Sequence, residues 1–166
     1  KKLLKMGRVF FNTRENVHEL NTATYQVLAS DSGKTFLLDS AAEMDITLPA
    51  EADISEGWNA RFVIKTANAD VGYKIHCTDK TDTTGQMFDG ALSVIMTTSG
   101  ASSTNQAVLA ATNDSLITLD SDLANNGATK GTFIDIFKSE ANKFFVTGVV
   151  VSTDDDGTGA AIFSNA

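Results

Sequence analysis

The stretch that most constrains the fold is the run DSGKTFLLDSAAEMDITLP, from Asp31 to Pro49, which has the pattern of turn, strand, loop, strand and stop. Its Asp-Ser-Gly start is a tight-turn signal, because Asp and Ser bond to nearby backbone and Gly accepts a positive φ. The second strand alternates with period two, so Met44, Ile46 and Leu48 share one face. Pro49, the only proline, ends it because proline has no N–H for a ladder. This segment has no residue pattern typical of a catalytic site, which favours a structural module over an enzyme.

Short alternating segments separated by polar turns continue along the chain. Residues 58–66 alternate well, and the apolar segments 132–138 and 143–151 predict a hairpin between them. About ten short strands in one chain of 166 residues predict an all-β fold, an antiparallel β-sandwich or barrel. The predicted core consists of apolar residues that share the inner faces of these strands, namely Phe36, Ile46, Leu48, Trp58, Phe62 and Ile64.

The N-terminal residues differ from the rest in charge and in pattern. Residues 1–20 carry five Lys or Arg and two Glu, a local charge of +3 on a chain of net charge −8, and they have no clear periodicity. We predict an extended arm over residues 1–22, with one helical turn near residues 14–20, and a single β-domain over residues 23–166. A basic, apolar arm on an acidic body indicates docking on another surface. The predicted docking residues are Lys2, Leu3, Leu4, Lys5, Arg8, Val9, Phe10, Phe11 and Arg14.

Composition and motifs argue against several function classes. An acidic body is a poor partner for nucleic acid, which needs clustered Lys and Arg. The longest strongly apolar stretch, residues 144–151, is too short to cross a bilayer, so no membrane partner is expected. The nucleophile-elbow, zinc-protease, phosphate-loop and dinucleotide motifs are all missing from the sequence. We therefore expect no enzymatic activity, no catalytic residues and no cofactor.

Two local patterns resemble functional sites but favour ordinary structure. His76 and Cys77 are neighbours on a predicted strand and point to opposite faces, so they do not form a nucleophile–base pair. Three consecutive acids, Asp154–Asp156, lack the alternate carboxylates and the twelfth-position Glu of a calcium loop. Acidic residues before Gly157 favour a solvated turn, and no metal is expected.

Several motifs resemble a pattern in tailed-bacteriophage virion proteins: the segments Asp31–Phe36, Ile46–Pro49 and Gly57–Phe62, with Gly131–Ile136 and Asn142–Gly148 similar to the hairpin of the same family. Phe145 stands where that hairpin usually has Trp or Tyr. Such motifs occur in capsid decoration proteins, head fibres and tail-associated β-domains. A one-domain chain with a short basic arm and no stalk is most similar to a decoration (cement) protein.

The resemblance implies a structural virion protein on the outer capsid surface, which binds the lattice of the major capsid protein and stabilises the head. On this basis the arm would be the capsid-binding element, and the protein would be a homotrimer at three-fold positions. The predicted trimer-interface residues lie on the two most apolar strands and are Phe133, Ile134, Phe137, Phe144 and Phe145. The alternative is a carbohydrate-binding receptor-recognition module of a phage tail fibre or head fibre, with a sugar platform among Trp58, Tyr25 and Tyr73. Trp58 and Tyr73 have the pattern of core residues.

Overall fold

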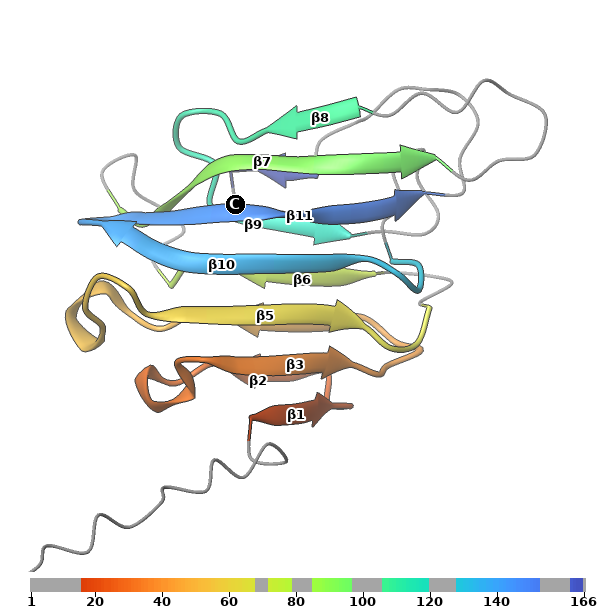
Figure 1. Cartoon of the computed structure of the whole chain (residues 1–166). Coiled ribbons are helices and arrows are strands. Elements are labelled where there is room, and N and C mark those ends of the chain that lie inside the picture. Colours follow the sequence, from red (N-terminus) through yellow and green to blue (C-terminus); the bar gives the residue numbers. More distant parts are fainter. Residues whose placement is uncertain are drawn as a thin grey trace, which may run out of the picture.

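The protein is a sandwich of two mixed β-sheets in a computed structural model that describes residues 16–67, 72–78, 85–96, 106–119, 128–152 and 162–165 (Figure 1). Sheet A has the strand order β1-β3-β5-β10-β11-β7-β8, and sheet B has the order β12-β9-β6-β4-β2. The described residues form twelve strands. The predicted all-β sandwich is therefore confirmed.

The elements of sheet A are β1 (Val17–Leu20), β3 (Lys34–Leu38), β5 (Asn59–Ile64), β7 (Met87–Met96), β8 (Gln106–Leu109), β10 (Phe133–Glu140) and β11 (Lys143–Ser152). The elements of sheet B are β2 (Thr24–Gln26), β4 (Met44–Thr47), β6 (Tyr73–His76), β9 (Leu116–Leu119) and β12 (Phe163–Ser164). Two short 3-10 turns, η1 (Ala29–Asp31) and η2 (Glu51–Asp53), precede β3 and β5.

The first six strands wind as three stacked coils, because the chain alternates between the sheets. Strands β1, β3 and β5 pair parallel in sheet A, and β2, β4 and β6 pair parallel in sheet B. Five of the ten strand pairings among the described residues are antiparallel, as predicted, and the other five are parallel, so both sheets are mixed. The alternating pattern fixes which side chains face inward, but it does not encode the direction of the neighbouring strand.

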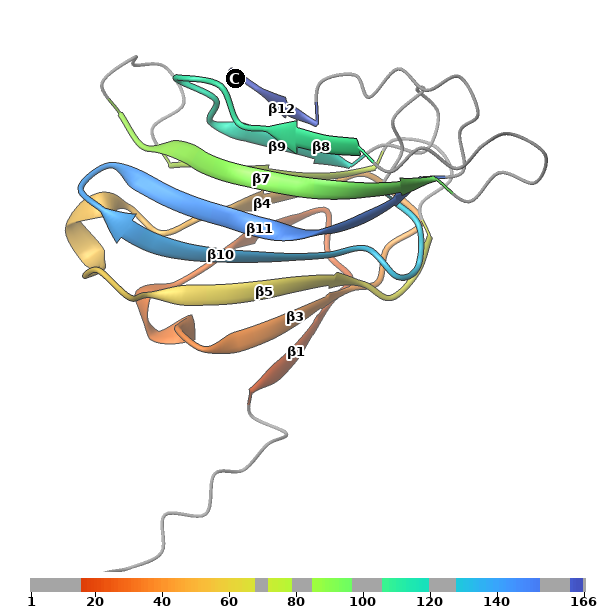
Figure 2. The same cartoon turned by 45° about the horizontal axis from the view of Figure 1, so that its top comes forward.

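The predicted C-terminal hairpin is confirmed, since β10 and β11 pair antiparallel around the turn at Ala141 and Asn142. β10 also pairs antiparallel with β5, and β11 pairs parallel with β7. The hairpin therefore joins the coiled half of sheet A to its later strands (Figure 2). Both of its strands are central, and neither offers an open edge.

The core lies between the two sheets and includes all six residues that the sequence pattern places there. Phe36 and Phe62 are fully buried and stack with ring centroids 5.2 Å apart. Trp58 is 5% exposed and meets the Phe144 ring edge-on at 6.0 Å. Tyr73 is also completely buried, so neither Trp58 nor Tyr73 belongs to a surface platform for sugars.

The described part of the predicted arm belongs to the β-domain. Val17–Leu20 forms β1 and pairs with β3, where a helical turn was predicted. Leu20 is 2% exposed, and its burial in the core explains why this segment joins the sheet. All nine predicted docking residues lie between positions 2 and 14, outside the described residues.

The close approach of β7 and β11 generates a stability prediction. Gly90 has φ +112°, and a Cβ there would lie 2.3 Å from the Val146 carbonyl oxygen. Gly90→Ala is expected to cost about 3 kcal/mol, because two paired backbones must separate. Gly33→Ala is the control, since Gly33 has φ +83° in open space and should cost only about 1 kcal/mol. Urea unfolding measures both, and equal losses would contradict the prediction.

Candidate functional site

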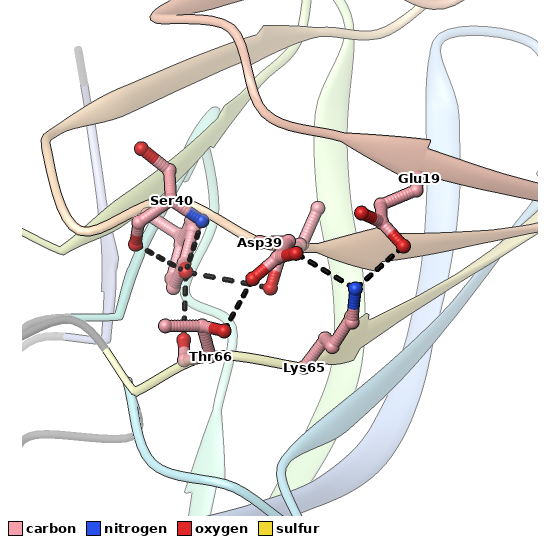
Figure 3. A network of polar contacts seen from close by, with 7 residues as sticks. Glu19, Asp39, Ser40, Lys65 and Thr66 are labelled. Atoms are coloured by element: carbon pink, nitrogen blue, oxygen red, sulfur yellow. Dashed lines mark hydrogen bonds and ion pairs between the residues drawn. The ribbon is translucent and has the colours of Figure 1, made fainter.

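A polar network ties the three coils together at the ends of their sheet A strands (Figure 3). Lys65 follows β5, and its Nζ lies 2.6 Å from Glu19 Oε2 and 2.7 Å from Asp39 Oδ2. Glu19 belongs to β1, and Asp39 directly follows β3. One ammonium group therefore bridges three successive coils.

Tyr73 extends this network into sheet B. Its hydroxyl oxygen lies 2.8 Å from the carbonyl oxygens of both Ser40 and Thr66, and it accepts a hydrogen bond from the Ser40 N–H at 3.2 Å. The Thr66 hydroxyl donates to the second carboxylate oxygen of Asp39. Since both Asp39 oxygens are occupied by partners from its own chain, we interpret the network as structural.

The network predicts a pH dependence of stability. Lys65 and then Thr66 lower the pKa of Asp39 to about 2. A carboxylate whose pKa is lower in the folded chain than in the unfolded chain, where it is about 3.9, stabilises the fold above that unfolded value. The contribution is lost as the pH falls from about 4 through about 2. Urea midpoints for Asp39→Asn should therefore vary less over this range than those of the parent chain.

The control for this experiment is Asp89→Asn, which replaces an exposed carboxylate on β7, away from the network. It should keep the parent pH dependence. If the urea midpoints of Asp39→Asn and of the parent chain changed with pH in the same way, the prediction would be contradicted. The network would then stabilise the charged and the neutral carboxyl group of Asp39 equally.

His76 and Cys77, the adjacent titratable pair of β6 and its end, point in different directions. Cys77 points into the core, where burial raises the pKa of its thiol, and His76 instead places Nε2 2.5 Å from Asp45 Oδ1. The described ranges contain no group of three or more His, Cys, Asp or Glu that could hold a metal ion. Asp154–Asp156 lie outside the described residues.

The outer faces of the two sheets differ in chemistry. Sheet B turns mainly polar side chains outward, among them Thr24, Gln26, Asp45, Thr47, Lys74 and Thr118. Sheet A turns apolar side chains outward on four adjacent strands. We call these residues the apolar face, and they are Leu37, Val63, Phe133, Phe137, Phe145 and Val149.

The register arranges the apolar face in two groups, which are separated by a polar row of Thr35, Arg61, Asp135 and Thr147. Leu37, Val63, Phe133 and Val149 occupy one row across β3, β5, β10 and β11. Phe137 is 38% exposed, and its ring centroid lies 5.1 Å from that of Phe145. A contiguous row of half-exposed apolar groups is typical of an interaction surface.

An ion pair lies at the centre of the apolar face. Arg61 Nε and Nη2 donate to the two carboxylate oxygens of Asp135 at 2.6 and 2.7 Å, and the guanidinium carbon lies 5.2 Å from the centre of the Phe133 ring. A shallow groove of about 330 Å³ beside the pair is lined in part by Asn59 and Phe137. Arg and aromatic residues around a bidentate pair are enriched in the cores of protein interfaces.

The structure divides the predicted trimer-interface residues into two groups. Phe133, Phe137 and Phe145 lie on the apolar face, whereas Ile134 and Phe144 are buried in the core, 0% and 1% exposed. The prediction is therefore wrong for Ile134 and Phe144. Both strands are apolar on their two faces, so their sequences do not show which face is inside.

Sequence reasoning missed Arg61 and Asp135 as functional candidates. Both alternate with core positions, so their outward direction could be predicted, but 74 residues separate them along the chain. The two residues meet because the register between β5 and β10 places them opposite each other. This register is seen only in the folded chain.

Most formal charges on and around the apolar face are paired, and the exception is the exposed Asp89 of β7, which lies opposite Phe145 and has no ion pair among the described residues. Besides Arg61 and Asp135, Lys65 binds Glu19, and Lys143 Nζ lies 2.7 Å from Glu140 Oε1. The chain as a whole carries a net charge of −8, so its copies repel one another. A face whose charges are mostly paired reduces this repulsion locally and favours contact there.

No protein-family model, curated protein sequence or solved structure matches the chain. Within the part of the chain that the structure describes, no helix is long and apolar enough to cross a membrane. The features that bear on function are therefore the sequence motifs and the two unlike faces of the sandwich.

Proposed function

We propose that this protein is a capsid decoration protein of a tailed bacteriophage. In this role it binds the outer surface of the major capsid protein lattice and stabilises the head. The observation that carries the proposal is the contrast between the apolar face of sheet A and the polar outer face of sheet B. A sandwich with one apolar face for protein contacts and one polar face for solvent suits a protein that is bound in a surface lattice.

The apolar face is proposed as the contact between copies in a homotrimer. Phe133, Phe137 and Phe145 would supply aromatic contact area, and the paired charges would lower the repulsion between acidic subunits. A cyclic trimer uses one interface three times and matches a three-fold position of a capsid. The contact involves the face of β10 and β11, since their edges are already paired.

The second partner is the major capsid protein, which residues 1–15 would bind. This segment carries five Lys or Arg and one Glu, and its charge is opposite to that of the acidic remainder. Its basic and apolar side chains suit a surface with both carboxylates and apolar pockets. Binding to assembled capsid alone stabilises the assembled state by mass action.

The groove beside Arg61 supports a second candidate, a carbohydrate-binding receptor module of a tail or head fibre. A paired Arg and Asp, an exposed Asn59 and the Phe137 ring offer polar groups and a stacking surface to a sugar. Binding of the full chain on a glycan array would favour this function. Hundreds of copies per particle by quantitative mass spectrometry would favour decoration, whereas about a dozen would favour the tail.

The proposed trimer contact is tested with Phe137→Asp. A charge in the centre of the contact is expected to cost about 2 kcal/mol or more, which is about thirtyfold in the affinity of the protein for undecorated capsids. Thr118→Asp is the matched control on the outer face of sheet B and should bind normally. Cosedimentation gives the affinities, and a reconstruction of decorated capsids locates the copies. Isolated monomers away from three-fold positions would refute the trimer.

The proposed capsid contact of residues 1–15 is tested with Arg8→Glu. Reversal of one charge in a solvated contact should weaken capsid binding by up to about fivefold, with a smaller effect at high salt. Lys130→Glu is the control, because Lys130 is exposed on the body. Equal losses for the two variants would show that only net charge matters and would contradict a specific role of the segment.

A further inference from the structure

Strands β1, β3 and β5 begin at the same end of the sandwich, because they run parallel (Figure 1). η1 and η2 precede β3 and β5 there, so we call this end the η end. The chain enters β1 at the η end through Asn16, whose carbonyl oxygen accepts a hydrogen bond from Thr35 N at 2.7 Å. Residues 1–15 therefore join the sandwich at the end that carries both loops.

Two grooves of about 270 Å³ each open at the η end and share Ala50 and Thr78 in their walls. We call them together the η2 groove. One part is lined by the apolar residues Leu28, Ala29 and Pro49, and the Leu28 side chain is 54% exposed. An apolar wall of this kind accommodates aliphatic side chains from a bound segment.

The rim of the η2 groove is acidic. Glu51 lines one part and Asp53 the other, and Glu51 pairs with the buried Lys138. Asp53 is exposed, and the described part of the chain provides no ion pair to its carboxylate. Residues 1–15 have the complementary composition, with five Lys or Arg next to Leu3 and Leu4.

We propose that the η2 groove binds the N-terminal segment of the same copy, residues 1–15. Its apolar side chains would lie against the Leu28 wall and its basic side chains beside Asp53. Fifteen residues reach about 50 Å when extended, so the segment is long enough to lie along the groove. A short tether gives effective concentrations of about millimolar, which makes weak contacts sufficient.

This contact rests on the proposed function in one respect, the assignment of residues 1–15 to capsid binding. The groove then acts as a competing site within the free protein. The groove covers residues 1–15 until a capsid surface binds this segment more strongly. In the free protein it therefore suppresses association between the acidic body of one copy and the basic segment of another.

The contact is tested on the full chain with a nitroxide label at Gly7→Cys. Cys77 does not compete for the label, because it is buried and its thiol pKa is raised. We expect loss of the amide NMR signals of Ala29, Ala50 and Ala52, which line the groove. The same signals should return in 1 M salt, where the screening length is about 3 Å.

Charge-reversed variants assign the contact to the rim. Asp53→Lys should restore the groove signals in the labelled chain. Glu43→Lys reverses one partly exposed carboxylate before β4 and should leave the signal loss intact. Equal effects of the two variants would overturn the proposal.

A mixture of labelled chain and isotope-enriched unlabelled chain shows whether the contact is within one copy. Signal loss in this mixture would assign the groove to the segment of another copy and would overturn the proposal, as would a uniform loss over the surface. No capsid is present in these measurements. A failure here therefore leaves the capsid-binding function to be decided by the sedimentation experiments.

Discussion

The antiparallel pairing of β10 with β5 is the contact on which the rest of the structure depends. It joins the coiled half of sheet A to the later strands, and its register places Ile134 opposite Phe62 and Asp135 opposite Arg61. A slip of β10 by one residue would turn Ile134 outward and bury Asp135 away from Arg61, so hydrophobic burial and the ion pair select the same register. The core and the apolar face are therefore fixed by one pairing.

The sequence predicts the faces of the strands well and their partners poorly. Alternation with period two identifies Phe36, Trp58 and the other core positions, because each segment contains that information locally. It does not give the parallel pairing of the coils, which arises when each connection crosses to the opposite sheet. β1 was missed because it is short and only Leu20 shows its burial.

The candidate site was predictable only in part, for a related reason. Phe133, Phe137 and Phe145 were identified by their apolar character, but so were Ile134 and Phe144 on the buried face of the same hairpin. A strand that is apolar on both faces reveals its orientation only when a second sheet covers one of them. Arg61 acquires its role from Asp135, a partner far away in sequence.

The parallel pairing of β1 with β3 has a mechanical consequence. When the N-terminal segment is anchored and the body is pulled along the strand axis, the ladder between β1 and β3 is loaded in shear, so its hydrogen bonds share the force. Lys65 adds an ion pair from Glu19 to the neighbouring coils and resists the same displacement. A pull across the sheet would instead load these bonds one at a time and peel β1 away. The direction of attachment thus sets the tensile strength of the body at its anchored end.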